Sequence, residues 1–493
     1  MKQSIYPQRS QAANAVFENV VPRKILVVPI DFSKEIHEAQ ICRGTGEYLL
    51  KEPLRVYNSL TGLDYLEKRI EKNCRKYGIE KSAVVVCGED PPSFSTNFIH
   101  GLKLRGLLFV RVNAKEASRL RQSARASTNA LDLNGIAQAA IHRRGYDPAD
   151  YTAVYAALKQ STRARRQLVK QMTVTKNQIH TQVDVLFPGF LKASGTDLEP
   201  FCNASLALMA DNFSAVRIQR MKTGTLEKIL KQNRIRQPQG MAAALQEHSR
   251  QVAPAPAELA AIMSHNLSAF VNLLRQQQES IARLEESCAQ LLAQTPCFIL
   301  LTIPGVAIVM AAEIAAELGD PANWPAAKLI ASYAGIVSRI KNTGHPDNEP
   351  AVLSLPRDCN HRLKNALLWV AEHVIRYRHP IRRESPDHDG SHPLQAYAKS
   401  KQAVNGKYIL GTAKKLVRII CAMVKQQTPY LPCGPRPKNL DEANEIMESE
   451  MANAIAVIND NYRNIDLGGI PDDRNLMRQW LAKTTEDLKL NGK

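Results

Sequence analysis

The sequence has 493 residues and a formal net charge of +18, with a pI near 9.5. This length should hold more than one hydrophobic core, and the excess of Lys and Arg favours a polyanionic partner, most simply nucleic acid. The nine cysteines are scattered without a Cys-x-x-Cys pair, which argues against a zinc ribbon or a disulfide framework and suits a reducing cytoplasm.

Two stretches bear on targeting and membranes. Residues 1–23 are mixed and polar, so we expect no signal peptide. Residues 303–316 are the most apolar stretch, but they are short and contain Glu313, so we expect no membrane span.

Two short apolar runs in the first part of the chain end at acids. Residues 24–31 end at Asp31, and residues 82–87 are followed by Gly88 and Glu89. Short runs rich in branched residues are typical of buried strands. Further strands are predicted at 39–42, 54–57 and 107–112, with helices at 61–76 and 94–104. The order of three strands, helix, strand, helix and strand predicts an α/β domain, an RNase H-like mixed sheet with helices on its faces.

A third acidic element follows these strands. Asn129 and Asp132 are three residues apart and should share one face of a helix. Acids on two strands and a pair on a helix can hold two divalent ions, which can activate a nucleophile and stabilise the leaving oxygen in phosphodiester chemistry. Taken singly, Asp31 reads more simply as a turn residue, Asn129 as a helix cap and Asp132 as a solvated acid. The three elements in this order favour a metal site.

In order and local context these residues resemble the DEDD transposases of bacterial insertion sequences that are guided by a bridge RNA. The resemblance spans residues 24–430 and implies a RuvC-like domain in which Asp31, Glu89, Asn129 and Asp132 are catalytic and bind Mg²⁺ or Mn²⁺. Asn129 departs from the family, which has Asp there. An Asn carbonyl can ligate a metal but brings no charge, so an ion should be held more weakly.

From residue 148 the pattern changes to long helices. Apolar stripes at helical spacing run through 151–186 and 259–292, and an insertion separates them. This predicts an antiparallel coiled-coil arm, which in the resembled family contributes to dimerisation and RNA contact. Cations on the arm and its insertion are candidates for phosphate contact, or else form solvated helix faces: Arg163, Arg165, Arg166, Lys170, Arg217, Arg220 and Lys222.

A mostly helical second domain is predicted over 296–430. Residues 300–307 and 309–318 resemble a helix-hairpin-helix, whose turn at Gly305 would expose backbone N–H groups to a phosphate; a packed turn without a ligand is the alternative. Thr343 and Gly344 stand where the family has Ser-Gly, and that Ser is the family's nucleophile. A Thr hydroxyl can serve, but its branch constrains it more. Further phosphate-binding candidates are Arg357, Arg362, Lys364, Lys414 and Lys415.

The resemblance implies an RNA-guided DNA recombinase of the bacterial cytoplasm and nucleoid. Its partners would be target and donor DNA, a bridge-type guide RNA and further copies of itself, in a dimer or tetramer. Two alternatives stay open: a catalytically impaired nucleic-acid-binding relative, and a metal-dependent nuclease or junction resolvase. We expect an extension at 1–23, the RuvC-like domain at 24–147, the arm at 148–295, the second domain at 296–430 and an extension at 431–493.

Overall fold

The computed structural model describes residues 9–89, 95–121, 129–147, 153–191, 198–303, 305–321, 324–341, 352–376, 393–405, 408–426 and 430. The chain divides into two compact units. The first comprises Met1–Tyr151 and Asn323–Asn360, and the second comprises Thr152–Ala322 and His361–Lys493. Each is described by itself below.

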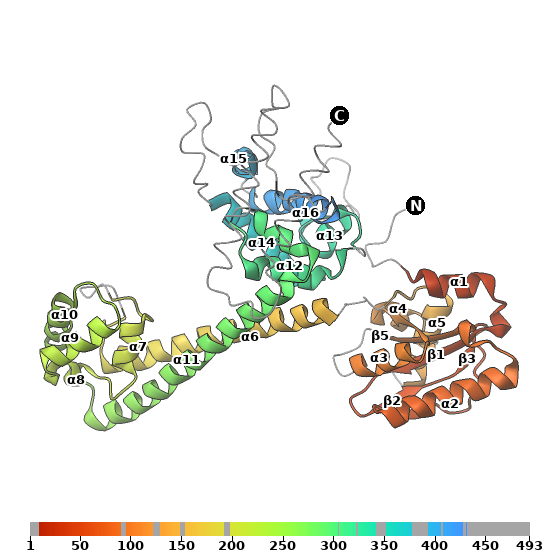
Figure 1. Ribbon diagram of the computed structural model, residues 1–493, viewed down its shortest axis with the longest axis horizontal. Coiled ribbons are helices and arrows are strands. Elements are labelled where there is room, and N and C mark those ends of the chain that lie inside the picture. Colours follow the sequence, from red (N-terminus) through yellow and green to blue (C-terminus); the bar gives the residue numbers. More distant parts are fainter. Residues whose placement is uncertain are drawn as a thin grey trace. The chain divides into compact units, whose positions relative to one another are not determined.

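A mixed sheet forms the centre of the first unit (Figure 1). Its strands are β1 (Leu26–Asp31), β2 (Ile36–Ala39), β3 (Cys42–Arg43), β4 (Leu54–Tyr57), β5 (Val84–Glu89) and β6 (Leu108–Val112). The order is β4-β2-β1-β5-β6, and β3 also pairs with β1. β1, β5 and β6 are parallel, while β2 and β3 run antiparallel to β1. The sheet confirms the predicted RNase H-like α/β class.

The strand predicted at 39–42 is divided in two. β2 ends at Ala39 and β3 begins at Cys42, yet both keep one register against β1, with Ile30 opposite Ala39 and Val27 opposite Cys42. The interruption lies opposite Pro29, which has no N–H to donate to the ladder. The Pro29 carbonyl still accepts a bond of 3.0 Å from the Gln40 N–H.

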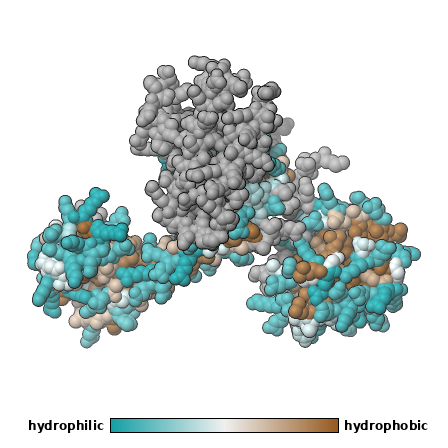
Figure 2. All heavy atoms as spheres, viewed as in Figure 1, coloured by the Kyte–Doolittle hydropathy of each residue, from teal (hydrophilic) through white to brown (hydrophobic). Residues whose placement is uncertain are grey.

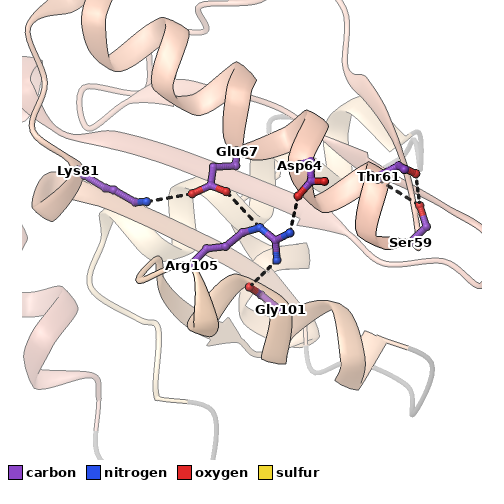
Figure 3. Close-up of polar contacts among 8 residues, drawn as sticks. Ser59, Thr61, Asp64, Glu67, Lys81, Gly101 and Arg105 are labelled. Carbon is purple, nitrogen blue, oxygen red and sulfur yellow. Dashed lines mark hydrogen bonds and ion pairs between the residues drawn. The ribbon is translucent and has the colours of Figure 1, made fainter.

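Helices cover both faces of the sheet. On one face α2 (Leu60–Tyr77) and α3 (Thr96–Leu104) bury Leu66 and Leu102 against Val28 and its neighbours. Arg105, directly after α3, pairs with Asp64 and Glu67 of α2 and so joins the two helices (Figure 3). Lys81, just before β5, also pairs with Glu67.

The opposite face of the sheet carries α1 (Gln11–Asn19), α4 (Ala114–Arg119) and α5 (Asn129–Ile141). Ala13 of α1 and Ile136 of α5 are buried in one apolar cluster with Val27 and Val85 of the strands. The helix α1 falls within the stretch expected to be an extension, and its apolar side chains explain why it packs here.

The remaining described part of the first unit is short. It contains α13 (Ala327–Tyr333) and an antiparallel pair of strands, β7 (Arg339–Lys341) and β8 (Val352–Ser354). Thr343 belongs to the chain between β7 and β8 and lies outside the described residues.

Two long helices, α6 (Ala153–Leu186) and α11 (Ala257–Ala293), run side by side in the second unit (Figure 1). They are antiparallel, because Arg165 near the start of α6 pairs with Glu285 near the end of α11, whereas Ile179 and Val183 share a core with Leu267 and Val271. The two long helices therefore form an antiparallel pair.

The insertion between these helices forms α7 (Asn203–Met209), α8 (Ala215–Arg220), α9 (Thr223–Gln232) and α10 (Pro238–Gln251). Leu226 and Leu245 of these short helices are buried in the same core as the ends of the long ones. Hydrophilic side chains cover much of their visible surface (Figure 2).

The rest of the described part of the second unit is helical. It comprises η4, a 3-10 helix (Pro296–Thr302), α12 (Ile308–Leu318), α14 (His361–Arg376), α15 (Pro393–Asn405) and α16 (Tyr408–Gln426). The first element of the predicted hairpin is thus a 3-10 helix, followed by a turn in which Gly305 has φ of 83°. Among the residues that the structure describes, no helix is long and apolar enough to cross a membrane.

Candidate active site

Asp31 and Glu89 lie at neighbouring strand ends. β1 and β5 are parallel and pair Ile30 with Gly88, so the next residues along each strand are the two acids. Five of the six residues of each strand are buried, and the terminal acid is the partly exposed one. Because parallel strands end at the same edge of a sheet, their carboxylates share one environment.

Asp132 reaches this environment from α5. The helix packs on β1, β5 and β6 through Ile136 and Ala140, which places its first turn near the strand ends. Asp132 raises the pKa of both Asp31 and Glu89, as a nearby negative charge must. The three acids predicted from the sequence therefore act on one another electrostatically.

Burial is the main cause of the shifted pKa values. It raises the pKa of the Asp31 carboxyl most, and Asp132 and Glu38 raise it further. Burial is also the largest cause of the raised pKa of the Glu89 carboxyl, and the nearby Asp31 raises that pKa further. Partly buried carboxylates that repel one another are stabilised by a cation.

Arg121 is a cation beside these acids, and the sequence pattern did not predict its role. Its Nη2 lies 2.7 Å from Asp132 Oδ1, and the two side chains are 19% and 22% exposed. Arg121 also lowers the pKa of Asp31 and Glu89. Asp132 Oδ1 is buried, and its ion pair with Arg121 does not have the geometry of a hydrogen bond. A single Arg in a sequence with so many basic residues carries no local signal of this role.

Asn129, the fourth predicted ligand, is the first residue of α5 and is exposed. It lies one helical turn before Asp132, on the same face of the helix as predicted. Its amide is neutral, so it adds nothing to the repulsion among the acids.

The donor set fits a hard divalent cation. Asp31, Glu89 and Asp132 offer carboxylate oxygens, the ligands that Mg²⁺ and Mn²⁺ prefer. Within the described part of the chain, no three ligand side chains are gathered closely enough to form a metal-binding cluster. Arg121 instead contacts one of the acids. An ion bound here would have to draw the acids together and displace or share the place of the Arg121 guanidinium.

Replacing Arg121 with Gln tests this competition. Removing one positive charge beside the acids should tighten Mn²⁺ binding on the order of tenfold, because ion and guanidinium repel each other at a partly buried site. Without metal, R121Q should melt at a lower temperature than the wild type, because the carboxylates lose their cation. Calorimetric titration and melting curves measure the two effects. R75Q, which removes an exposed Arg paired with Glu71, should change neither; unchanged Mn²⁺ affinity in R121Q would contradict the competition.

Three predicted nucleic-acid-binding arginines make ion pairs inside the second unit. Arg163 donates to both carboxylate oxygens of Glu317 at 3.0 and 3.1 Å. Arg165 pairs with Glu285 at 2.7 Å. A phosphate contact from such an arginine requires its buried or half-buried acid to lose its partner, which is costly.

Arg166 lies 3.8 Å from Glu313 and stands over the Trp369 ring at 5.2 Å. Burial raises the pKa of the Glu313 carboxyl, and Arg166 and Arg165 oppose this shift. Together with Arg163, these arginines join α6 to α11 and α12.

The other predicted phosphate contacts are more open. Exposed positions are Lys170, Arg220, Lys222, Arg357 and Arg362, and half-buried ones are Arg217, Gly305, Lys364, Lys414 and Lys415. Arg217 pairs with Asp211 at 2.7 Å, and Lys415 stands over the Tyr397 ring at 4.4 Å. An exposed side chain loses less solvation and packing on meeting a phosphate than a buried one does.

The fold and the acids define the class of protein: an RNase H-like DEDD domain joined to a helical part. Two family models match the chain. The transposase model for the DEDD domain of IS110 elements matches residues 28–188, and the model of the IS116/IS110/IS902 transposase family matches residues 297–385. The chain therefore belongs to the IS110 family of transposases. The first match includes Asp31, Glu89 and Asp132, and the second includes Thr343.

Two curated relatives are similar to part of the chain. The pilin gene-inverting proteins of Moraxella bovis and Moraxella lacunata are each 24% identical over 190 residues. These residues are 38% of this chain and 56% of each relative, so the chain spans about half the length of the curated relatives that it matches.

Proposed function

We propose that the protein is an RNA-guided DNA recombinase that moves an insertion sequence. The observation that carries the proposal is the electrostatic coupling of Asp31, Glu89 and Asp132 at the ends of β1, β5 and α5. Family membership and two relatives named for inverting a gene support DNA rearrangement as the outcome.

In the proposed mechanism Asp31, Glu89 and Asp132, with Asn129, would hold Mg²⁺ or Mn²⁺, which when bound would supply Lewis-acid stabilisation of charge on the reacting phosphate. Arg121 keeps the acids together between binding events. Thr343 Oγ1 attacks a DNA phosphorus atom, its proton passes to a carboxylate or to solvent, and the displaced DNA oxygen takes up a proton. The phosphothreonine ester conserves the bond energy, so a second DNA hydroxyl can attack its phosphorus atom. The bond from phosphorus to Thr343 Oγ1 then breaks, Oγ1 takes up a proton, and strand exchange is complete.

Sequence choice is assigned to a bridge-type guide RNA that pairs with target and donor DNA. This suits a protein with a net charge of +18 spread over the chain, because contacts to a nucleic-acid backbone need charge and not base readout. The exposed cations Lys170, Arg220 and Lys222 are the better candidates on the arm and its insertion, since Arg163, Arg165 and Arg166 have acidic partners. We propose a dimer or tetramer, in which one copy's Thr343 serves another copy's acids.

A specific observation favours a second function. Asn129 is neutral and exposed, and Thr343 replaces the family's Ser, so two positions expected to complete the chemistry differ. A nucleic-acid-binding protein that has lost recombination would show this combination. A nuclease or junction resolvase that uses the first unit alone would need the acids but not Thr343.

Strand exchange in vitro separates these functions. The full chain is incubated with Mg²⁺, the non-coding RNA flanking its gene and both DNA partners, and recombinant junctions are quantified. Wild type should recombine, and Thr343→Ala should lose at least about 1,000-fold because Ala has no hydroxyl to attack the phosphorus atom. RNA binding without recombination supports the impaired relative, and cleavage that survives Thr343→Ala supports the nuclease. Gain of activity only in N129D with T343S would identify a decayed enzyme.

A further inference from the structure

A hollow of about 470 Å³ lies beside Glu89, and apart from Glu89 and Arg121 its lining residues take no part in the proposed chemistry. Its lining residues are Glu89, Ala114, Lys115, Ser118, Arg119 and Arg121. Three of these side chains are cations and one is an acid. A hollow of this charge next to a cluster of acids suits an anion that must approach the acids.

The sheet register explains why α4 borders this hollow. Glu89 of β5 pairs with Val112 of β6, and α4 begins two residues after Val112. Asn113 caps the helix, accepting a bond of 2.9 Å from the Lys115 N–H through its side-chain oxygen. The start of α4 is therefore held next to Glu89.

One face of α4 is fixed by packing and the other is free to bind. Ala117 is fully buried against α5, where its carbonyl closely approaches Gly135. Lys115, Ser118 and Arg119 have the spacing of one helix face, and all three are exposed. Among the residues that the structure describes, neither Lys115 nor Arg119 makes an ion pair, so both charges are available to a ligand.

We propose that this hollow binds the phosphate backbone of the DNA strand presented to Asp31, Glu89 and Asp132. Lys115 and Arg119 pair with phosphate oxygens, Ser118 donates a hydrogen bond, and Arg121 adds positive charge on the side nearer the acids. The site sets the register of the strand, so that the reacting phosphate reaches the acids. This inference rests on the proposed function, because it takes the ligand to be the strand on which the acids act.

DNA binding by charge-matched variants tests the proposal. The double variant K115Q/R119Q is compared with the double variant K68Q/K72Q. Lys68 and Lys72 are an exposed pair at the same spacing on α2 and lie outside the hollow. Affinity of the full chain for a fluorescein-labelled DNA duplex is measured in EDTA at several salt concentrations. K115Q/R119Q should weaken binding about tenfold and reduce the slope of log Kd against log salt by about 1.8, as expected for two lost phosphate contacts on duplex DNA. K68Q/K72Q should stay within about twofold.

Further arms separate the possible failures. Unaltered melting temperature in K115Q/R119Q, and recovery of affinity in K115R/R119K, show that lost charge and not misfolding causes the effect. Equal losses in both double variants, or DNA binding unchanged while binding of an RNA duplex weakens, would overturn the proposal. Strand exchange by the wild type is measured separately. If the wild type recombines and K115Q/R119Q binds DNA as tightly as the wild type, this inference alone is refuted. If the wild type is inert and K115Q/R119Q shows the predicted loss of DNA affinity, only the proposed function is refuted.

Discussion

Asp31→Asn is expected to abolish Mn²⁺ binding at the acid cluster and to lower strand exchange at least about 1,000-fold. The amide keeps the size of the side chain but removes the charge from the end of β1, which the parallel pairing with β5 places beside Glu89. Losing a charged ligand removes several kcal/mol of metal-assisted stabilisation, and each 1.36 kcal/mol is tenfold in rate. Calorimetric Mn²⁺ titration and the recombination assay measure the two losses.

The same variant has a predicted pH signature without metal. The pKa of Asp31 is raised by burial first and by Asp132 and Glu38 next, so the folded state holds this proton more firmly than the unfolded chain. That stabilisation is present at low pH and is lost as the pH rises through the folded pKa. The Asn side chain of D31N does not titrate, so the variant does not lose stability in this way. In EDTA, D31N should therefore melt above wild type at pH 8, and the difference should shrink as the pH falls.

Asp147→Asn is the matched control, since Asp147 is exposed in the same unit. It should leave Mn²⁺ binding and recombination unchanged. Undiminished Mn²⁺ binding in D31N would show that the metal lies elsewhere and would remove the basis of the proposed mechanism.

Gly135→Ala is expected to damage both stability and activity. A Cβ at this position of α5 would lie 2.3 Å from the Ala117 carbonyl oxygen of α4 and 3.0 Å from Arg121 Cγ. Backbone cannot yield as a side-chain tip can, so α5 must move away from α4. Overpacking of this kind costs about 1–3 kcal/mol, and misplacing Asp132 by about 1 Å can cost about 100-fold in rate. Melting curves and the recombination assay report the two effects.

Gly240→Ala makes the same chemical change where there is room. An added Cβ in α10 would meet no atom within 4 Å. Removing a helical Gly should stabilise the protein by about 0.5–1 kcal/mol. If G135A melted like wild type and recombined normally, the close approach of α4 and α5 would have no part in placing Asp132.

Local pattern alone was enough to predict the acids and the elements that carry them. The buried runs that end at Asp31 and Glu89 form β1 and β5. Asn129 and Asp132, three residues apart, lie in the first turn of α5. Hydrophobic periodicity also predicted the two long helices. These features depend on neighbours in sequence, which is why the chain reveals them without its fold.

Tertiary structure decided which charges meet. Arg121 contacts Asp132, Arg163 contacts Glu317 and Arg165 contacts Glu285, and no local spacing indicates any of these pairings. The hollow beside Glu89 likewise depends on the fold, because β6 pairs with β5 and leads into α4 at that edge of the sheet. Sequence by itself determined where the acids stand along the chain. Packing decided which cations pair with acids, because ion pairing depends on distance in space. It also left Lys115 and Arg119 available for the proposed contact with a phosphate.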